Sequence, residues 1–521
     1  MKVKDIHDEL PSQFADRIGY AYTSKIDKDM KKENGQYFTP YKIADFMSSF
    51  SNKINQKELN ILDPGCGTGT LSCSLIEYLL RNNKSLIEIN LTCYEIDSEL
   101  IDITKQVLIY LENWIKLVNS KLIFKWELRE SDFVIDNQFT FLENSLFHGN
   151  KVQKQFDLII SNPPYFKISK SDKRAKIAES IVYGQPNIYS IFMMLSAKLL
   201  SKNGEMIFII PRSFASGPYF RLFREIFFNS ILLTKIHIFK SRKKAFKRDD
   251  VLQENIIIKA IKKNKSKDDE VTVSISESSE DLNDATTSRY FFDELVNMKS
   301  KQKILYIPLS QKDETIIRIF NKWQNNLEKN FIKISTGPVV AFRKKDYLCD
   351  SSESSNKKYS PLLWLTNTQP MKLVFPGSRN KKHYIEDCSI TQNVLVKNRN
   401  YVLLRRFSTK DDKSRLIAAP YFAENFKQLK IGIENHLNYI YKYNGELSKS
   451  EVMGLAALFN SSLFDLYFRT FNGNTQVSVT ELKEIPLPPM EKIEAIGFEL
   501  LNSKEFSQEN IDSVINKLIL H

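Results

Sequence analysis

The sequence predicts an α/β fold, in which a doubly wound parallel sheet is followed by a mixed α+β region. Three observations support this division. Short apolar runs alternate with longer segments of helical spacing from about residue 40 to 265. Two of these runs, 156–160 (FDLII) and 204–210 (GEMIFII), are typical of strands buried on both faces. Beyond residue 264 the alternation stops, and short strand-like runs lie among turn-forming residues.

The individual elements follow from local patterning. We expect strands where compact apolar runs end in turn residues, and helices where apolar residues recur every three or four positions. The predicted strands are 60–63, 87–96, 156–160 and 204–210, and the predicted helices are 71–80, 100–118 and 188–200. Repeated alternation of strand and helix predicts parallel strands.

Composition also divides the chain. Residues 264–288 are rich in Ser, Asp, Glu and Lys and contain few large apolar side chains, which is typical of a linker. We therefore predict a first domain over 1–265, a linker or exposed loop over 266–286, a second domain over 287–490, and a C-terminal helical tail over 491–521.

The bulk numbers restrict the class of protein. With 42% hydrophobic and 26% charged residues over 521 positions, the chain can fold into two to four globular domains. Its net charge of +13 favours a polyanionic partner, and a generally Lys-rich protein explains it equally well. Five cysteines without a C-x-x-C pair predict a reduced, cytoplasmic protein. We expect no signal peptide, no membrane span and no metal site.

A glycine-rich turn lies between the first predicted strand and helix. Residues 61–70 read ILDPGCGTGT, and the region of interest runs from Asp63 through Pro64, Gly65 and Cys66 to Gly67. Glycines let the backbone turn sharply and leave N–H groups at a helix start, where a carboxylate can bind. Glu95 ends the next predicted strand, where a carboxylate can accept both hydroxyls of a ribose.

A proline-stiffened loop follows the strand at 156–160. It reads SNPPY, so Asn162 is followed by Pro163, Pro164 and Tyr165. The stiff loop holds the Asn162 amide oxygen and the Pro163 carbonyl as two fixed acceptors, which match the two hydrogens of an exocyclic amine. The Tyr165 ring offers a flat face for a stacked base. A turn carrying an exposed aromatic is the plainer explanation of the same residues.

These motifs resemble the N6-adenine DNA methyltransferases of restriction–modification systems, most closely their gamma group. The resemblance implies a Rossmann-like sheet of the S-adenosylmethionine-dependent type, followed by a target-recognition domain. It also implies that Thr39 and the 63–67 turn line the methionine half of the cofactor and that Asp132 accepts from its adenine. Pro164 would serve cofactor and target alike. Asn162 to Tyr165 would hold the target adenine, and Phe246 is our candidate for stacking on its far face.

The second half carries a weaker part of the resemblance. Segments 393–397 (NVLVK) and 472–477 (NGNTQV) resemble those of PstI/BsuBI-like adenine methylases. Basic and polar residues there and beside the base pocket are candidate DNA contacts, because phosphates bind cations and base edges bind amides. These candidates are Lys243, Lys244, Arg248, Arg405, Arg406, Asn474 and Gln476. Any single cluster of this kind is more often a solvated surface.

The sequence thus predicts a site-specific enzyme that transfers a methyl group from S-adenosylmethionine to N6 of a flipped-out adenine in double-stranded DNA. We expect it to act as a monomer and to protect host DNA, with the cognate restriction endonuclease as a separate protein. N4-cytosine methylation stays open, as does methylation of an RNA or protein nitrogen, because all present a similar amine or amide. A non-catalytic DNA-specificity subunit is the alternative outside the enzymes.

Overall fold

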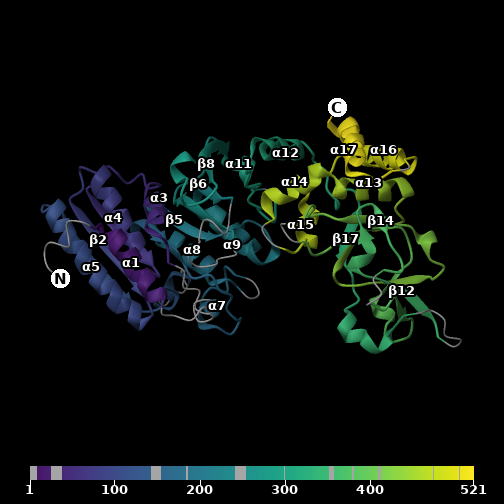
Figure 1. Cartoon of the computed structure of the whole chain (residues 1–521), viewed down its shortest axis with the longest axis horizontal. Coiled ribbons are helices and arrows are strands. Elements are labelled where there is room, and N and C mark those ends of the chain that lie inside the picture. The colour runs from purple at the N-terminus through teal and green to yellow at the C-terminus, as the bar shows by residue number, and fades with distance from the viewer. Residues whose placement is uncertain are drawn as a thin grey trace. The chain divides into compact units, whose positions relative to one another are not determined.

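The chain forms two compact units in the computed structural model. Unit 1 comprises residues 1–215 and 219–305, and unit 2 comprises 216–218 and 306–521. Figure 1 shows both units with their element labels. The structure describes residues 9–24, 38–141, 154–182, 186–240, 254–298, 300–350, 357–377, 381–408, 412–472, 475–503 and 505–520.

Unit 1 is built on one large sheet. Within the described residues it has nine strands in the order β3-β2-β1-β4-β5-β7-β6-β8-β9. The neighbouring strands β3, β2, β1, β4 and β5 pair in parallel, whereas β7 is antiparallel to both β5 and β6. The strands are β1 (Glu58–Pro64), β2 (Glu88–Glu95), β3 (Ile123–Glu130), β4 (Phe156–Ser161), β5 (Leu200–Pro211), β6 (Leu232–Phe239), β7 (Asn255–Ile261), β8 (Glu270–Ser276) and β9 (Thr286–Phe291).

Helices cover the sheet in two groups. Helices α1, α3, α4 and α5 pack on one another, and α8 packs against α6, α9 and β5. Alternate residues of β4 explain this layering, since Leu158 and Ile160 enter the core with the first group while Ile159 is buried outside that core. The described helices of unit 1 are α1 (Pro11–Thr23), α3 (Tyr41–Ser48), α4 (Thr70–Asn82), α5 (Ser98–Val118), α6 (Phe133–Asp136), α7 (Lys173–Ile177), α8 (Ile188–Leu199), α9 (Arg221–Ser230) and α11 (Phe292–Leu295).

The predicted fold class is confirmed, with two corrections. The sheet is not wholly parallel, because β7 and β9 run antiparallel to their neighbours. The predicted linker at 266–286 is wrong over 270–276, which forms β8 and pairs with β6. Polar composition misled the prediction because this strand buries Val271 and Val273, whereas Thr272 and Ser274 are only partly buried.

Unit 2 is a mixed α+β unit. Among its described residues, one sheet has the order β10-β20-β17-β18 and another the order β11-β15-β12-β19-β16. Its main strands are β10 (Ile332–Thr336), β11 (Leu348–Cys349), β12 (Tyr359–Leu363), β15 (Tyr384–Glu386), β16 (Leu395–Lys397), β17 (Tyr401–Arg405), β18 (Ala418–Tyr421), β19 (Lys430–Ile433) and β20 (Leu437–Lys442). Its helices are α12 (Gln311–Asn321), α13 (Lys449–Asn460), α14 (Ser462–Phe471), α15 (Val479–Glu484), α16 (Met490–Leu501) and α17 (Gln508–Ile515).

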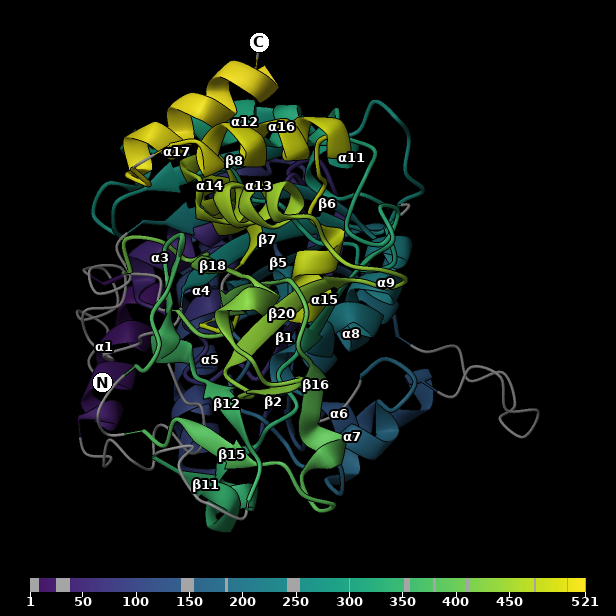
Figure 2. The same ribbon diagram turned by 90° about the vertical axis from the view of Figure 1, so that its right-hand side faces the viewer.

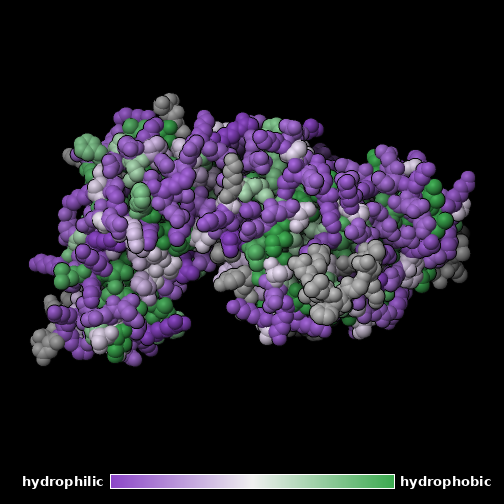
Figure 3. Space-filling view, turned by 180° about the vertical axis from the view of Figure 1, so that it is seen from behind, coloured by the Kyte–Doolittle hydropathy of each residue, from purple (hydrophilic) through white to green (hydrophobic). Residues whose placement is uncertain are grey.

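The C-terminal helices belong to unit 2 rather than to a separate tail. Helices α13 and α16 lie side by side (Figure 2), and glycines allow their close approach. A Cβ atom at Gly454 would lie 1.9 Å from the carbonyl oxygen of Ile493, and one at Gly497 would lie 1.8 Å from that of Ser450. Most large apolar side chains of the described residues are buried, and the face in Figure 3 is mainly hydrophilic. None of the described helices has the length and apolarity that crossing a membrane requires.

A candidate cofactor and active-site cavity

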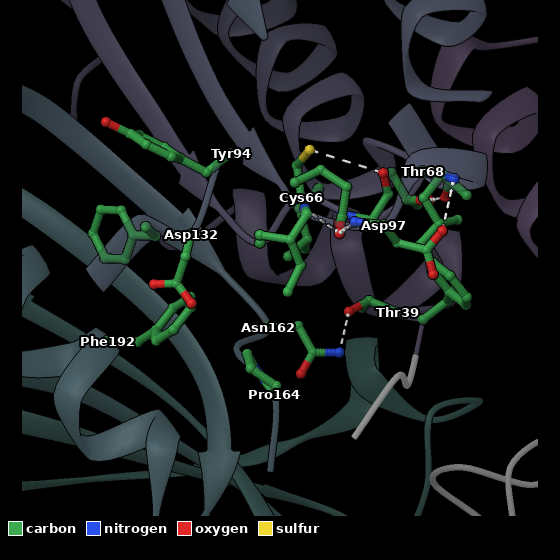
Figure 4. Close-up of a pocket in the computed structure, with 18 of the residues that line it drawn as sticks. Thr39, Cys66, Thr68, Tyr94, Asp97, Asp132, Asn162, Pro164 and Phe192 are labelled. Atoms are coloured by element: carbon green, nitrogen blue, oxygen red, sulfur yellow. Dashed lines mark hydrogen bonds between the residues drawn. The ribbon is translucent and has the colours of Figure 1, made fainter. Parts of the chain in front are cut away.

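A cavity of about 510 Å³ lies in unit 1 where the adjacent strands β3, β2, β1 and β4 end. Carboxyl ends of parallel strands meet at one edge of a sheet, so the segments that follow them converge there. Figure 4 shows side chains from these segments gathered around the cavity. Predicted residues in its lining are Thr39, Gly65, Cys66, Gly67, Glu95, Asp132, Asn162 and Pro164.

The glycine turn brings backbone close to the cavity. Gly65, Gly67 and Gly69 have φ angles of 71°, 56° and 81°, which side-chain-bearing residues rarely adopt. A Cβ atom on Gly67 would also lie 2.8 Å from the Phe38 ring. Helix α4 begins directly after Gly69, so the positive end of its dipole lies at this turn. The turn therefore suits a negatively charged ligand group.

Glu95 is the most firmly held carboxylate of the cavity. Its Oε1 accepts hydrogen bonds from the backbone N–H groups of Ile96 (2.8 Å) and Asp97 (3.0 Å), and its Oε2 accepts one from Gly67 (3.0 Å). Burial raises the pKa of Glu95, and these three N–H groups oppose that rise. The carboxylate is thus fixed in orientation while it still lines the cavity.

One carboxylate oxygen of Asp132 caps a helix, and the other faces Arg174. Its Oδ1 caps α6 by accepting from the N–H groups of Val134 (2.8 Å) and Ile135 (3.0 Å). Its Oδ2 lies 3.6 Å from Nη1 of Arg174, which also pairs with Asp172 at 2.7 Å. The cap fixes the carboxylate, so Oδ2 has a defined position at the cavity.

Apolar side chains that the sequence analysis did not single out form much of the wall. Ile96, Phe133 and Phe192 line the cavity, and the two phenylalanine rings lie 5.1 Å apart between centroids. Ile96 directly follows Glu95, so its position next to a predicted site residue could have identified it as a lining residue. Phe192 lies within a helix that is buried along nearly its whole length, where nothing in its own sequence neighbourhood separates it from core residues.

The Asn162 side chain is held by two hydroxyl groups. Its Nδ2 donates to Oγ1 of Thr39 at 3.0 Å (Figure 4). The Tyr165 hydroxyl is hydrogen-bonded to its Oδ1. The Tyr165 hydroxyl also lies 2.7 Å from the carbonyl oxygen of Ile209. The amide is therefore oriented with its nitrogen toward Thr39.

Tyr165 does not present the open ring face that the sequence suggested. Its side chain is 7% exposed and lies outside the cavity lining, as does Pro163. Burial raises the pKa of Tyr165 well above its usual value. The hydroxyl of this buried ring lies within hydrogen-bond distance of Asn162 Oδ1 and of the Ile209 carbonyl oxygen, and its single hydrogen can be donated to one of them at a time.

Asp63 and Pro64 support the turn rather than line the cavity. Asp63 is fully buried, and its Oδ2 accepts a 2.6 Å hydrogen bond from Ser72. Burial raises the pKa of Asp63 to about 7. The sequence placed both residues beside the cofactor because it cannot tell which residues of a turn face inward.

Several predicted residues lie outside the described part of the chain. They are Lys243, Lys244, Phe246, Arg248 and Asn474. Arg405, Arg406 and Gln476 are described and lie in unit 2. Within the described ranges, no three His, Cys, Asp or Glu side chains gather as metal ligands would.

Two relatives cover nearly the whole chain. It is 33% identical over 493 residues to type II methyltransferase M.BsuBI of Bacillus subtilis, covering 94% of this chain and 95% of that protein. It is 31% identical over 504 residues to type II methyltransferase M.PstI of Providencia stuartii, covering 96% of each. A solved methyltransferase from Listeria monocytogenes, described as a putative class I S-adenosylmethionine-dependent enzyme, aligns with a TM-score of 0.40 and 16% identity over 53% of this chain and 77% of that one.

A family model gives the same class. Residues 89–246 match the Eco57I restriction-modification methylase family, and this stretch includes Glu95, Asp132 and the NPPY loop. The fold and the cavity are accordingly those of a restriction–modification methyltransferase. The chain belongs to the family of type II DNA methyltransferases that includes M.BsuBI and M.PstI. The resemblance inferred from the sequence is thereby confirmed.

Proposed function

We propose that the protein transfers a methyl group from S-adenosylmethionine to N6 of an adenine in double-stranded DNA. The observation that carries this proposal is the Asn162 amide, fixed by Thr39 and Tyr165 beside the cavity that the glycine turn and Glu95 form. The methylation protects host DNA, and the cognate restriction endonuclease is a separate protein.

The cavity residues suit the parts of S-adenosylmethionine. The fixed Glu95 carboxylate suits the two ribose hydroxyls, and Oδ2 of Asp132 suits an amino hydrogen of the cofactor's adenine. Ile96 and Phe192 supply apolar contact for a purine ring. The positive end of α4 at the glycine turn suits the methionine carboxylate. When bound, the cofactor supplies an electrophilic methyl group on its sulfonium.

The NPPY loop holds the nitrogen that receives the methyl group. The Asn162 Oδ1 and the Pro163 carbonyl accept hydrogen bonds from the target amine, which keeps its lone pair directed at the methyl donor. Thr39 positions Asn162, because accepting a hydrogen bond from Nδ2 fixes which way the amide is turned and therefore where the acceptor Oδ1 lies. The reaction requires no covalent nucleophile from the protein.

We propose that unit 2 contacts the DNA and that the target adenine is flipped out of the duplex. Extruding an adenine costs a few kcal/mol of unstacking, on the order of one stacking step, and Phe246 compensates for it by stacking on the flipped base. Arg405, Arg406, Gln476, Lys243, Lys244, Arg248 and Asn474 are the proposed DNA contacts. One monomer methylates one strand at a time.

Long-read sequencing of a methylation-free bacterial host that expresses the protein tests the proposal. We expect N6-methyladenine at one short sequence, and no modified base in the Asn162→Ala variant. The purified variant should bind S-adenosylmethionine with affinity within about twofold of wild type, because Glu95 and the glycine turn are unchanged. Its kcat should fall by at least about 10²–10³-fold, to a level at which no methylated base is detected. Methylation of cytosine N4, or full activity of the variant, would refute the assignment.

A further inference from the structure

Three distant segments of unit 2 meet around the Arg406 guanidinium. Residues 406–408 run antiparallel to 475–477, with Phe407 bridging to Gln476. The Val477 N–H donates to the Arg406 carbonyl at 2.8 Å, and the Ser408 N–H donates to that of Thr475 at 3.1 Å. The third segment is fixed by the Arg406 N–H, which donates to the His436 carbonyl at 2.9 Å. We call Arg406, Phe407, His436 and Gln476 the platform.

Arg406 fixes the orientation of the Gln476 amide. With its oxygen assigned to the side that faces the guanidinium, the Gln476 amide accepts from Nε (3.1 Å) and Nη2 (2.8 Å) of Arg406. The Nη1 of Arg406 donates to the Asn435 carbonyl at 3.0 Å. A guanidinium has no acceptor, so the amide must turn its oxygen toward this fork. Its NH2 group is consequently directed away from Arg406, as a hydrogen-bond donor in a defined position.

A buried network holds the platform in place. Arg415 is fully buried, and its Nε donates to Oγ of Ser408 (3.0 Å) while its Nη2 donates to Oδ1 of Asn472 (2.9 Å). Asn472 Nδ2 in turn donates to the Gln476 carbonyl at 3.2 Å and to the buried Glu481 carboxylate at 3.1 Å. The same network therefore fixes both antiparallel segments.

The platform combines apolar and polar groups at the surface. Phe407 is 38% exposed, and its ring lies 5.2 Å from that of His436, whose side chain is 53% exposed. The nearby Glu434 carboxylate is buried and pairs with His436 Nδ1 at 2.7 Å, so it does not offer an exposed negative charge. A rigid donor beside an aromatic ring matches the edge of a base pair, which presents acceptors and the thymine methyl group.

We propose that this platform reads one base pair of the methylated sequence, with Gln476 as the donor and Phe407 as the apolar contact. The partner is duplex DNA, and the base that Gln476 reads presents an acceptor in the major groove: purine N7, guanine O6 or thymine O4. This inference rests on the proposed function of the chain as a DNA methyltransferase.

Substitutions at Gln476 separate a reading role from a structural one. Gln476→Glu retains the oxygen that faces Arg406 but replaces the outward NH2 with an acceptor. Its preference at one position should therefore move to a base that carries a donor, adenine or cytosine. Gln476→Ala should relax that position, with discrimination falling about 5- to 100-fold. Arg406→Lys lacks the paired N–H donors of the guanidinium that hold the Gln476 oxygen, so base preference at the same position of the methylated sequence should weaken.

Lys427 provides the matched control. It is an exposed residue of unit 2, and it lines a separate surface pocket with Lys397 and Lys430. Lys427→Ala should methylate the wild-type sequence with unchanged preference, and lose at most about one unit of slope in the salt dependence of DNA binding.

The experiment maps methylated sites in a methylation-free host for each variant, with cofactor affinity and melting temperature measured on the purified proteins. An altered preference at one position in the Gln476 variants supports the platform. Unchanged preference in both overturns it, and so does complete loss of methylation in Gln476→Glu with normal melting. If Gln476→Ala does not fold, Gln476→Glu decides alone. A wild-type protein that methylates no DNA refutes the proposed function instead.

Discussion

The two units build their polar sites in different ways. In unit 1, three polar residues of the cavity lie within a few positions of a strand end: Glu95 ends β2, Asp132 follows β3 and Asn162 follows β4. In unit 2, the platform depends on Arg406 and Gln476, which are 70 positions apart. In unit 1, the ends of neighbouring parallel strands lie at one edge of the sheet, so residues near those ends come together. In unit 2, the platform residues are brought together by hydrogen bonds between segments that are far apart in the sequence.

The largest expected effect concerns the buried cation of unit 2. Arg415→Met leaves Ser408 and Asn472 without their shared donor and removes the cation near the buried Glu481 carboxylate, so we expect unit 2 to lose about 3–5 kcal/mol of unfolding free energy. Cofactor affinity in unit 1 should not change. Denaturant unfolding followed alongside cofactor titration checks both. Lys449→Met, which breaks an exposed pair with Glu424, should cost at most about 1 kcal/mol. Equal effects of the two variants would show that Arg415 has no special role.

The next effect tests the ribose-binding role of Glu95. Glu95→Gln keeps the size of the side chain but removes its charge and places an NH2 near backbone donors. Cofactor affinity should fall by about tenfold to a hundredfold, since hydrogen bonds to charged groups contribute about 1.5–3 kcal/mol. Calorimetric titration measures it. Glu130→Gln, at the exposed end of β3, is the control, and equal affinity in the two variants would contradict the assignment.

Several polar residues predicted from the sequence line the cavity, whereas other polar residues, such as Asp97 and Arg174, and most of the apolar lining were missed. Glu95 and Asn162 stand out because charge and amide chemistry at strand ends is unusual, whereas Phe192 resembles its buried neighbours in α8. Tyr165 was read as an open ring because the packing of its hydroxyl against Ile209 is a tertiary contact. Strand β8 was missed because hydrogen bonding to β6, not composition, decides its structure.

A pH dependence of folding stability, intermediate in size among these effects, is expected from His237 in unit 1. Burial lowers the pKa of His237 from 6.5 to about 4. The unfolded chain therefore binds a proton at His237 between these values while the folded chain does not, so stability falls as pH drops through this window, by about 2 kcal/mol at pH 5. Asp63 and Glu77, whose pKa values burial raises to about 7, act in the opposite direction.

The contribution of His237 is isolated by comparing the stability of wild type with that of a variant that lacks this histidine. The stability of wild type minus that of His237→Gln should decrease by about 2 kcal/mol between pH 7 and pH 5. Urea unfolding at both pH values measures this difference. A difference that stays constant with pH would mean that His237 titrates normally in the folded protein.

The smallest expected effect concerns Thr39. Thr39→Val removes the acceptor of Asn162 Nδ2 with little change in shape, so we expect kcat to fall about tenfold, the equivalent of one neutral hydrogen bond. Affinity for the cofactor should change less than about threefold, and Thr39→Ser should restore kcat. Single-turnover kinetics separate the two quantities. An affinity loss with normal kcat would make Thr39 a cofactor contact instead of a positioning residue.

The central claim is that the fixed Asn162 amide directs methyl transfer to the N6 of adenine. Purified protein incubated with duplex DNA and S-adenosylmethionine carrying a labelled methyl group tests it directly, once the DNA is digested to nucleosides and analysed by mass spectrometry. The account predicts labelled N6-methyladenine with wild type and none with Asn162→Ala. Label in cytosine, or label restricted to RNA or protein, would contradict it.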